Sequence, residues 1–236
     1  MENDQKICIG IISYLPDDED RRLVRIQRLK KLLNRCDSNF KNLPILIIAQ
    51  NWKDDVIASR ENITVYNYDK LGITLARETL RQRFLEDTDY DYIICFDDDF
   101  ELRCEPSKSK VYLNYLRKNP DCIIEYENYL MNFCAISRWI YERNPYNLEI
   151  DPELGTGFED WIYISVVKRK YKEKSLTIKG LGIPLKPRSE LVNDKYSTWI
   201  QDSTDKDTLS AKSSKIIESS THDKKLVKPK DTEYIW

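Results

Sequence analysis

Three consecutive aspartates, Asp97, Asp98 and Asp99, come directly after the mostly apolar segment 90–96. Adjacent carboxylates repel one another, so they destabilise a fold unless a cation lies among them. Oxygen ligands suit a hard divalent ion such as Mg²⁺ or Mn²⁺, and an ion held by few carboxylates usually also binds substrate phosphates. The pattern therefore predicts a metal and phosphate site. A solvated acidic turn that merely ends a strand is the alternative.

A second group of chemically capable residues is the segment Gly155-Thr156-Gly157-Phe158-Glu159-Asp160-Trp161. Its two glycines allow tight backbone geometry and the close approach of a ligand, and the acidic pair then begins a helix. A carboxylate beside an indole can act as a general base, because local desolvation raises its basicity. The alternative is an acidic pair that only compensates the helix dipole.

Two single residues are candidates to complete these groups. Arg77 carries a permanently charged fork that suits a diphosphate or one of the aspartates, although a surface arginine on a helix is the simpler interpretation. His222 is the only histidine of the chain and lies in a polar segment. It is either a solvated side chain or a candidate third ligand of the ion.

Alternating strands and helices are expected to position these residues. Four apolar, β-branched runs in the first hundred residues predict buried strands, at 6–13, 43–49, 63–66 and 90–96. Apolar residues at helical spacing predict helices around 23–33 and 71–84. This alternation predicts an α/β fold with a mostly parallel sheet flanked by helices. Ligands bind outside the carboxyl ends of the strands in such sheets, and the three aspartates lie at one such end.

The second half of the chain is less regular. We expect a helix and two strands at 111–116, 122–126 and 130–136, a short helix at 138–143 capped by Ser137, and a longer helix at 162–171. From about Lys186 the chain becomes polar, yet it ends on Tyr234, Ile235 and Trp236. We therefore expect residues 1–200 to form the domain and the polar segment 201–236 to pack back on it.

Composition limits the classes of function. The 236 residues, 41% of them hydrophobic, suit one large domain with a sizeable core. With 38 basic and 40 acidic residues, the chain offers no strong electrostatic case for nucleic acid or an anionic membrane. No transmembrane run or signal peptide is evident, and the six cysteines contain no C-x-x-C pair. A cytoplasmic protein with buried, reduced cysteines is expected.

The order and spacing of these motifs resemble those of the GT-A class of nucleotide-sugar glycosyltransferases, in the style of family 2 and the β-1,4-galactosyltransferase-like inverting enzymes. The resemblance covers about residues 6–180. It rests on a strand ending at Ser13-Tyr14, on Ala76-Arg77, on a D-x-D motif in Asp97–Asp99 and on the Gly-x-Gly-Phe-Glu-Asp-Trp segment. It implies a GT-A fold in which residues 1–100 bind the nucleotide-sugar and residues 101–200 bind the acceptor.

The same resemblance implies a role for each candidate residue. Asp160 would be the catalytic base, and Glu159 and Trp161 would contact the acceptor. Asp99 and His222 would hold Mn²⁺ or Mg²⁺. The nucleotide-sugar, expected to be a UDP-sugar, would be bound by Ser13, Tyr14, Gln50, Arg77, Asp97, Asp98 and Gly157. The implied reaction is metal-dependent transfer of a sugar to an acceptor hydroxyl with inversion.

Other functions stay open. A sugar nucleotidyltransferase would need a glycine-rich, basic loop after the first strand, whereas the segment Leu15–Glu19 is acidic and has no glycine. A non-catalytic glycan-binding module with this fold is a further alternative. The expected acceptor is a glycan. A modified base of phage DNA is the alternative acceptor. The near-zero net charge disfavours it, but the basic residues between Lys168 and Lys174 keep it open, although a solvated helix end is the simpler interpretation of that cluster.

Overall fold

A central sheet organises the computed structural model, which describes residues 5–52, 57, 60–98, 100, 102, 104–126, 133–146, 159–179 and 232–234, without the side chains of 159, 161, 179 and 232–234. The described residues form an eight-stranded sheet in the order β3-β2-β1-β4-β6-β5-β7-β8. Strand β6 runs antiparallel to its neighbours β4 and β5, and the other pairs are parallel. The expected α/β fold with a mostly parallel sheet is confirmed.

The strands and helices have the following bounds. The strands are β1 Ile7–Tyr14, β2 Ile45–Gln50, β3 Ile63–Tyr68, β4 Tyr92–Asp97, β5 Ile123–Tyr126, β6 Phe133–Ser137, β7 Ser175–Lys179 and β8 Thr232–Tyr234. The α-helices are α1 Glu19–Asn39, α2 Ile73–Asp87, α3 Pro106–Lys118, α4 Arg138–Arg143 and α5 Glu159–Lys170, and a 3₁₀ turn, η4, spans Lys172–Lys174.

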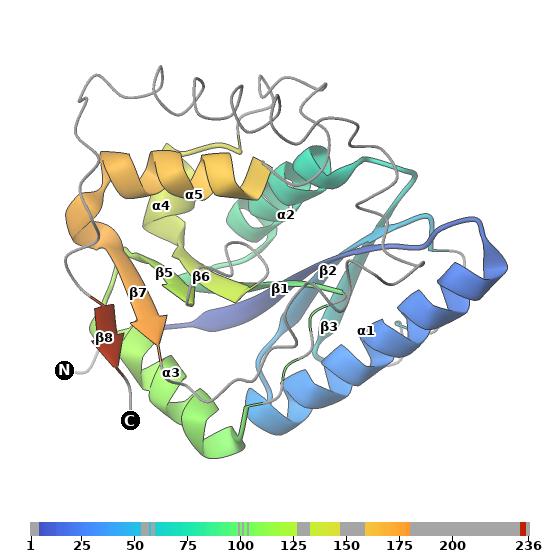
Figure 1. Ribbon diagram of the computed structural model, residues 1–236, viewed down its shortest axis with the longest axis horizontal. Helices are drawn as coiled ribbons and strands as arrows, with labels where there is room; N and C mark the ends of the chain where they lie inside the picture. Colours follow the sequence, from blue (N-terminus) through green and yellow to red (C-terminus); the bar gives the residue numbers. More distant parts are fainter. Residues whose placement is uncertain are drawn as a thin grey trace.

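Helices cover both faces of the sheet (Figure 1). Helices α1 and α3 close one core, and α2, α4 and α5 close the other. Along β1, Ile9 and Ile11 enter the first core, whereas Cys8 and Ile12 enter the second. Because successive side chains of a strand point to opposite faces, a strand buried on both sides must be apolar at nearly every position. This explains the continuous apolar runs of β1, β2 and β4.

The chain changes direction within the sheet at β1. It passes outward from β1 to β2 and β3, then returns to place β4 on the other side of β1. The two central strands are in register with Ile12 opposite Asp97, so their carboxyl ends lie side by side. Open α/β sheets bind ligands in the crevice that such a reversal creates.

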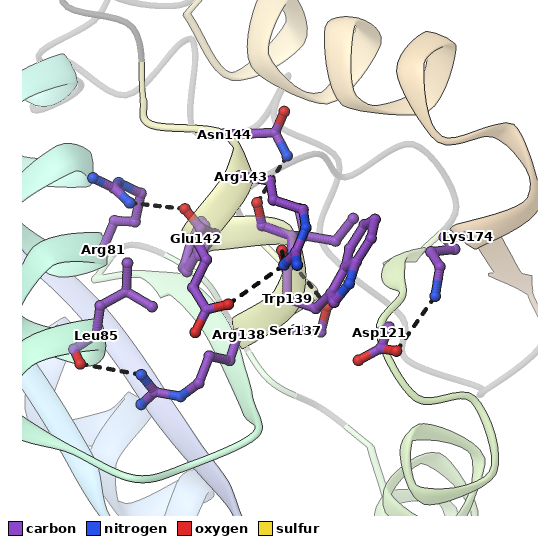
Figure 2. A network of polar contacts seen from close by, with 12 residues as sticks. Arg81, Leu85, Asp121, Ser137, Arg138, Trp139, Glu142, Arg143, Asn144 and Lys174 are labelled. Carbon is purple, nitrogen blue, oxygen red and sulfur yellow. Dashed lines mark hydrogen bonds and ion pairs between the residues drawn. The ribbon is translucent and has the colours of Figure 1, made fainter.

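The short helix α4 ties the second half of the chain to α2. Arg138 donates hydrogen bonds of 2.8 to 3.1 Å to main-chain carbonyls at the end of α2 and just beyond it, those of Phe84, Leu85, Thr88 and Tyr90. Figure 2 shows the Arg138–Leu85 bond together with a bond from Arg81 of α2 to α4. A helix leaves its last carbonyls unsatisfied, so Arg138 caps α2 and fixes its position against α4.

The C-terminal part returns to the sheet edge. Residues Thr232–Tyr234 form β8, which pairs in parallel with β7. The rest of the polar segment 201–236 lies outside the described residues. All six cysteines are free and buried. Among the helices that the structure describes, none has the length and apolar character needed to cross a membrane.

Candidate active site

The carboxyl ends of the adjacent strands β1 and β4 bring several of the predicted site residues together. Ser13 and Tyr14 end β1, Asp97 ends β4, and Asp98 follows directly. Asp97 and Asp98 point to opposite faces of the sheet, because their partners lie on α2 and α1 respectively. The two aspartates therefore belong to two different clusters, one on each side of the sheet.

Asp98 lies on the α1 side and is 4% exposed. Its Oδ1 accepts a hydrogen bond of 2.5 Å from Nη1 of Arg25 in α1, and its Oδ2 accepts one of 2.6 Å from Ser13 Oγ. Trp52 Nε1 donates to the same Ser13 hydroxyl at 3.1 Å. Asp98 is thus bound through both oxygens to neighbouring protein groups, and it fixes the end of β4 against β1 and α1.

Arg77 of α2 joins two carboxylates on the opposite face of the sheet. Its Nη2 donates to Asp97 Oδ1 at 2.5 Å and to Asp160 Oδ2 at 3.2 Å. The Arg77 side chain is fully buried. Burial alone lowers the pKa of Arg77, but the charges of Asp160 and Asp97 outweigh burial and raise this pKa well above its ordinary value. The guanidinium therefore stays charged and links the end of β4 to the start of α5.

The guanidinium of Arg77 has further donors available. Its Nε and Nη1 are buried and have no hydrogen-bond partner among the described residues. Buried donors are nearly always paired, because an unpaired one has lost its bond to water without replacement. An acceptor that approached this side of Arg77 would therefore gain charge-assisted hydrogen bonds.

Asp160 lies in the first turn of α5, where the positive end of the helix dipole favours a carboxylate. Its side chain is buried, and its Oδ1 accepts a hydrogen bond of 2.6 Å from the hydroxyl of Tyr146. Arg77 and Tyr146 thus bind different oxygens of the same carboxylate. Asp97 and Asp160, far apart in the sequence, thus meet at Arg77.

Two other predicted residues lie at neighbouring strand ends. Gln50 ends β2, and its Oε1 accepts hydrogen bonds from the main-chain N–H groups of Leu71 at 2.9 Å and Gly72 at 3.1 Å. This bond holds the residues that lead into α2. The ammonium group of Lys70 lies 5.8 Å from the ring centre of Tyr14. The roles of Gln50 and Tyr14 in nucleotide binding stay predictions.

Several predicted residues are not placed. Asp99, Gly157 and His222 lie outside the described residues. Glu159 and Trp161 belong to α5, but the structure does not describe their side chains. The structure places both residues next to Asp160 in α5, and their roles stay predictions.

The residues expected to bind a divalent metal ion, Asp99 and His222, lie outside the described residues. Among the residues that the structure describes, no three His, Cys, Asp or Glu side chains are grouped to hold a metal. The carboxylates of Asp97, Asp98 and Asp160 lie against the guanidinium groups of Arg25 and Arg77. Carboxylate oxygens suit Mn²⁺ or Mg²⁺, and the roles of Asp99 and His222 as metal ligands stay predictions.

Three residues of these clusters were missed by sequence reasoning. Arg25 had a detectable signal, because it lies on the same helix stripe as the buried Leu29, Leu32 and Leu33, where a charge is unusual unless it is paired. Trp52 lies just after β2 and Tyr146 just after α4, and neither belongs to a motif. Nothing in the sequence distinguished them.

Comparisons with known proteins identify the fold. No protein-family model and no curated protein matches the sequence. Glucosyl-3-phosphoglycerate synthase from Mycobacterium tuberculosis in complex with UDP is similar in structure, with a TM-score of 0.52, 15% identity, and coverage of 93% of this chain and 81% of that one. S. aureus TarS 1–349 in complex with UDP has a TM-score of 0.51 at 10% identity, over 69% and 54% of the two chains. The chain has the fold of nucleotide-sugar glycosyltransferases.

A third similar structure extends the comparison to another nucleotide. The mannosyltransferase PcManGT from Pyrobaculum calidifontis, in complex with GDP-Man and Mn²⁺, has a TM-score of 0.50 at 10% identity, over 70% of this chain and 52% of that one. The chain thus spans about half the length of the mannosyltransferase and TarS structures. The expected GT-A fold is confirmed, and at these identities the likeness is one of fold.

Proposed function

We propose that this protein is a glycosyltransferase that moves a sugar from a nucleotide-sugar, a UDP-sugar in the first instance, to an acceptor hydroxyl. The observation that carries the proposal is the buried Asp97–Arg77–Asp160 cluster. It lies at the crevice where an α/β sheet of this kind binds ligands. The same fold holds UDP or GDP-Man in the three similar structures.

The donor would bind at the carboxyl ends of β1 and β4. Nε and Nη1 of Arg77, which have no hydrogen-bond partner among the described residues, could bind a phosphate oxygen, and a planar guanidinium is well suited to a diphosphate. Asp99 and His222 would hold Mn²⁺ or Mg²⁺, which offsets the charge that develops on a leaving diphosphate when it is bound. Ser13, Tyr14, Gln50 and Gly157 would line the remainder of the donor site.

Asp160 would remove the proton of the acceptor hydroxyl. Attack at the anomeric carbon passes through an oxocarbenium-like state, and a single base with in-line displacement gives inversion. The first turn of α5 suits this role, because Asp160 is held by Arg77 on the side of Asp97. Glu159 and Trp161, its neighbours in the chain, would contact a glycan acceptor.

The donor half of the proposal is tested by calorimetric titration with UDP, with and without Mn²⁺. Binding should require the metal, and Asp99→Ala should remove that requirement together with most of the affinity. Asp121→Asn is the matched control, because Asp121 is half exposed, pairs with Lys174 far from the site, and has a φ of 61° that asparagine tolerates. A protein that binds no UDP or GDP in Mn²⁺ contradicts the proposal.

The catalytic half is tested by hydrolysis of UDP-glucose, UDP-GlcNAc and GDP-mannose in Mn²⁺, with water as acceptor. Asp160→Asn should keep UDP affinity nearly intact and lower turnover by about 10² to 10⁴, as expected for loss of a general base. Asp121→Asn should retain wild-type turnover. UDP binding without turnover of any donor would instead indicate a non-catalytic binding module.

A further inference from the structure

The carboxylate of Asp160 is held from two directions. Tyr146 donates its hydroxyl to Oδ1 at 2.6 Å, and Arg77 donates to Oδ2 at 3.2 Å. All three side chains are buried. Arg77 also binds Asp97, whereas the hydrogen bond from Tyr146 is the shorter of the two that Asp160 accepts. Two donors on different oxygens define the plane of a carboxylate, so rotation of Asp160 would break at least one of these bonds.

Tyr146 is itself held in place by groups on other elements. Its main-chain N–H donates to Glu78 Oε2 of α2 at 2.8 Å, and Arg81 holds both oxygens of Glu78 at 2.7 Å. Its ring stacks on Tyr163 of α5, with ring centres 4.5 Å apart and planes at 18°. Figure 2 shows Arg81, which also donates to a main-chain carbonyl of α4. Tyr146 therefore has one fixed orientation, aimed at Asp160.

We infer that Tyr146 is a positioning residue for the general base. It holds the Asp160 carboxylate in the one rotation that presents its remaining lone pairs to the acceptor hydroxyl. This inference rests on the proposed function. A carboxylate that can rotate away spends less time aligned with the acceptor proton that it removes, and catalysis depends steeply on that alignment. The Tyr146 hydroxyl binds the oxygen of Asp160 that Arg77 does not bind.

Tyr146→Phe keeps the stacked ring and removes only the hydroxyl. We expect kcat for donor hydrolysis to fall about tenfold or more, while the donor KM stays within about two-fold, because the lost bond is made to the base and not to the donor. Tyr92→Phe is the matched control. The Tyr92 hydroxyl also makes hydrogen bonds, donating to Asn119 O and accepting from Cys122 N, at the opposite end of β4 from Asp97. The Tyr92→Phe variant should leave both kcat and KM unchanged.

Thermal unfolding supplies a readout that needs no activity. The losses in Tm caused by Tyr146→Phe and Asp160→Ala should be less than additive in the double variant, because both remove one shared bond. Tyr92→Phe and Asp160→Ala should be additive. Additive losses for Tyr146 and Asp160, or a Tyr146→Phe enzyme with wild-type kcat, would overturn the inference while leaving the proposed function standing. A wild-type protein without donor turnover contradicts the proposed function first.

Discussion

Two neighbouring aspartates at the carboxyl end of β4 pair with arginines from opposite sides of the sheet. Asp97 pairs with Arg77 of α2, and Asp98 pairs with Arg25 of α1, each at 2.5 Å. A buried ion pair adds little net stability, because desolvation of both charges offsets their attraction. Removing one partner is different, since it leaves the other charge buried and unpaired. The clusters therefore fix the geometry of the strand end more than they stabilise the fold.

Asp98→Ala should consequently lower the free energy of unfolding by about 3 to 5 kcal/mol, because it leaves Arg25 buried without its carboxylate. Equilibrium denaturation in urea measures the loss. Asp89→Ala is the control, because Asp89 is exposed and pairs with the exposed Lys6. The double variant Asp98→Ala/Arg25→Met should recover part of the loss. Equal stability of Asp98→Ala and Asp89→Ala would show that the pair is dispensable.

At the scale of elements, the approach of α2 to the sheet decides where Arg77 lies. Gly10 of β1 faces α2, and a Cβ atom there would lie 2.5 Å from Ile93 Cδ1 and 2.9 Å from Leu80 Cδ2. The absence of a side chain lets Leu80 of α2 pack directly on the strand. Arg77, one turn before Leu80, thereby reaches Asp97 at the strand end.

Gly10→Ala should therefore destabilise the fold by about 1 to 3 kcal/mol through overpacking. Chemical denaturation would measure this loss. Ile93→Val removes the Cδ1 atom that the new methyl group would meet, so the double variant should lose less stability than the sum of the two single variants. Ser38→Ala, at an exposed position of α1, is the control and should change little. Strict additivity of Gly10→Ala and Ile93→Val would exclude a clash at this position.

The predictable elements were those with a strong apolar pattern. The buried strands β1, β2 and β4 are continuous apolar runs, and the short helix at 138–143 has the expected bounds because Ser137 caps it through the N–H of Ile140. Strand β7 alternates apolar and polar residues over only five positions, and β8 has three residues. Such short strands form because a neighbouring edge is available, which a local pattern does not reveal.

The residues of the candidate site also fall into a predictable and an unpredictable group. Its carboxylates were predictable, because polar residues at the end of a buried strand are conspicuous. Their partners were not, since Arg25 reaches Asp98 only through the packing of α1 on the sheet, and Tyr146, which follows α4, meets Asp160 only where α5 packs beside it. The sequence leaves Arg77 to bind a diphosphate or one of the aspartates, and its pairing with both Asp97 and Asp160 is evident only in three dimensions.

At the scale of the whole molecule, stability and metal binding should be separable. Asp97 and Asp98 carry their own counter-charges, so the fold does not depend on a divalent ion to relieve their repulsion. Any metal would act on the donor instead.

EDTA should therefore leave the Tm of the ligand-free protein unchanged, and abolish the rise in Tm that UDP with Mn²⁺ produces. A ligand that binds only the folded state raises stability by RT ln(1 + [L]/Kd), about 2.7 kcal/mol at a hundredfold excess over Kd. Differential scanning fluorimetry measures both effects. A large fall in Tm on adding EDTA alone would indicate a structural metal and contradict this separation.

The position of β1 also has a consequence for synthesis on the ribosome. Of the eight strands that the structure describes, β1 is synthesised before the others, yet Ile7 pairs with Tyr92 of β4, and the other edge of β1 pairs with β2. Until β4 has emerged, one side of a highly apolar strand offers unpaired backbone groups, and such edges recruit other chains. Nascent chains that stall before β4 should thus be the most prone to aggregate, and the ones that most need chaperone protection.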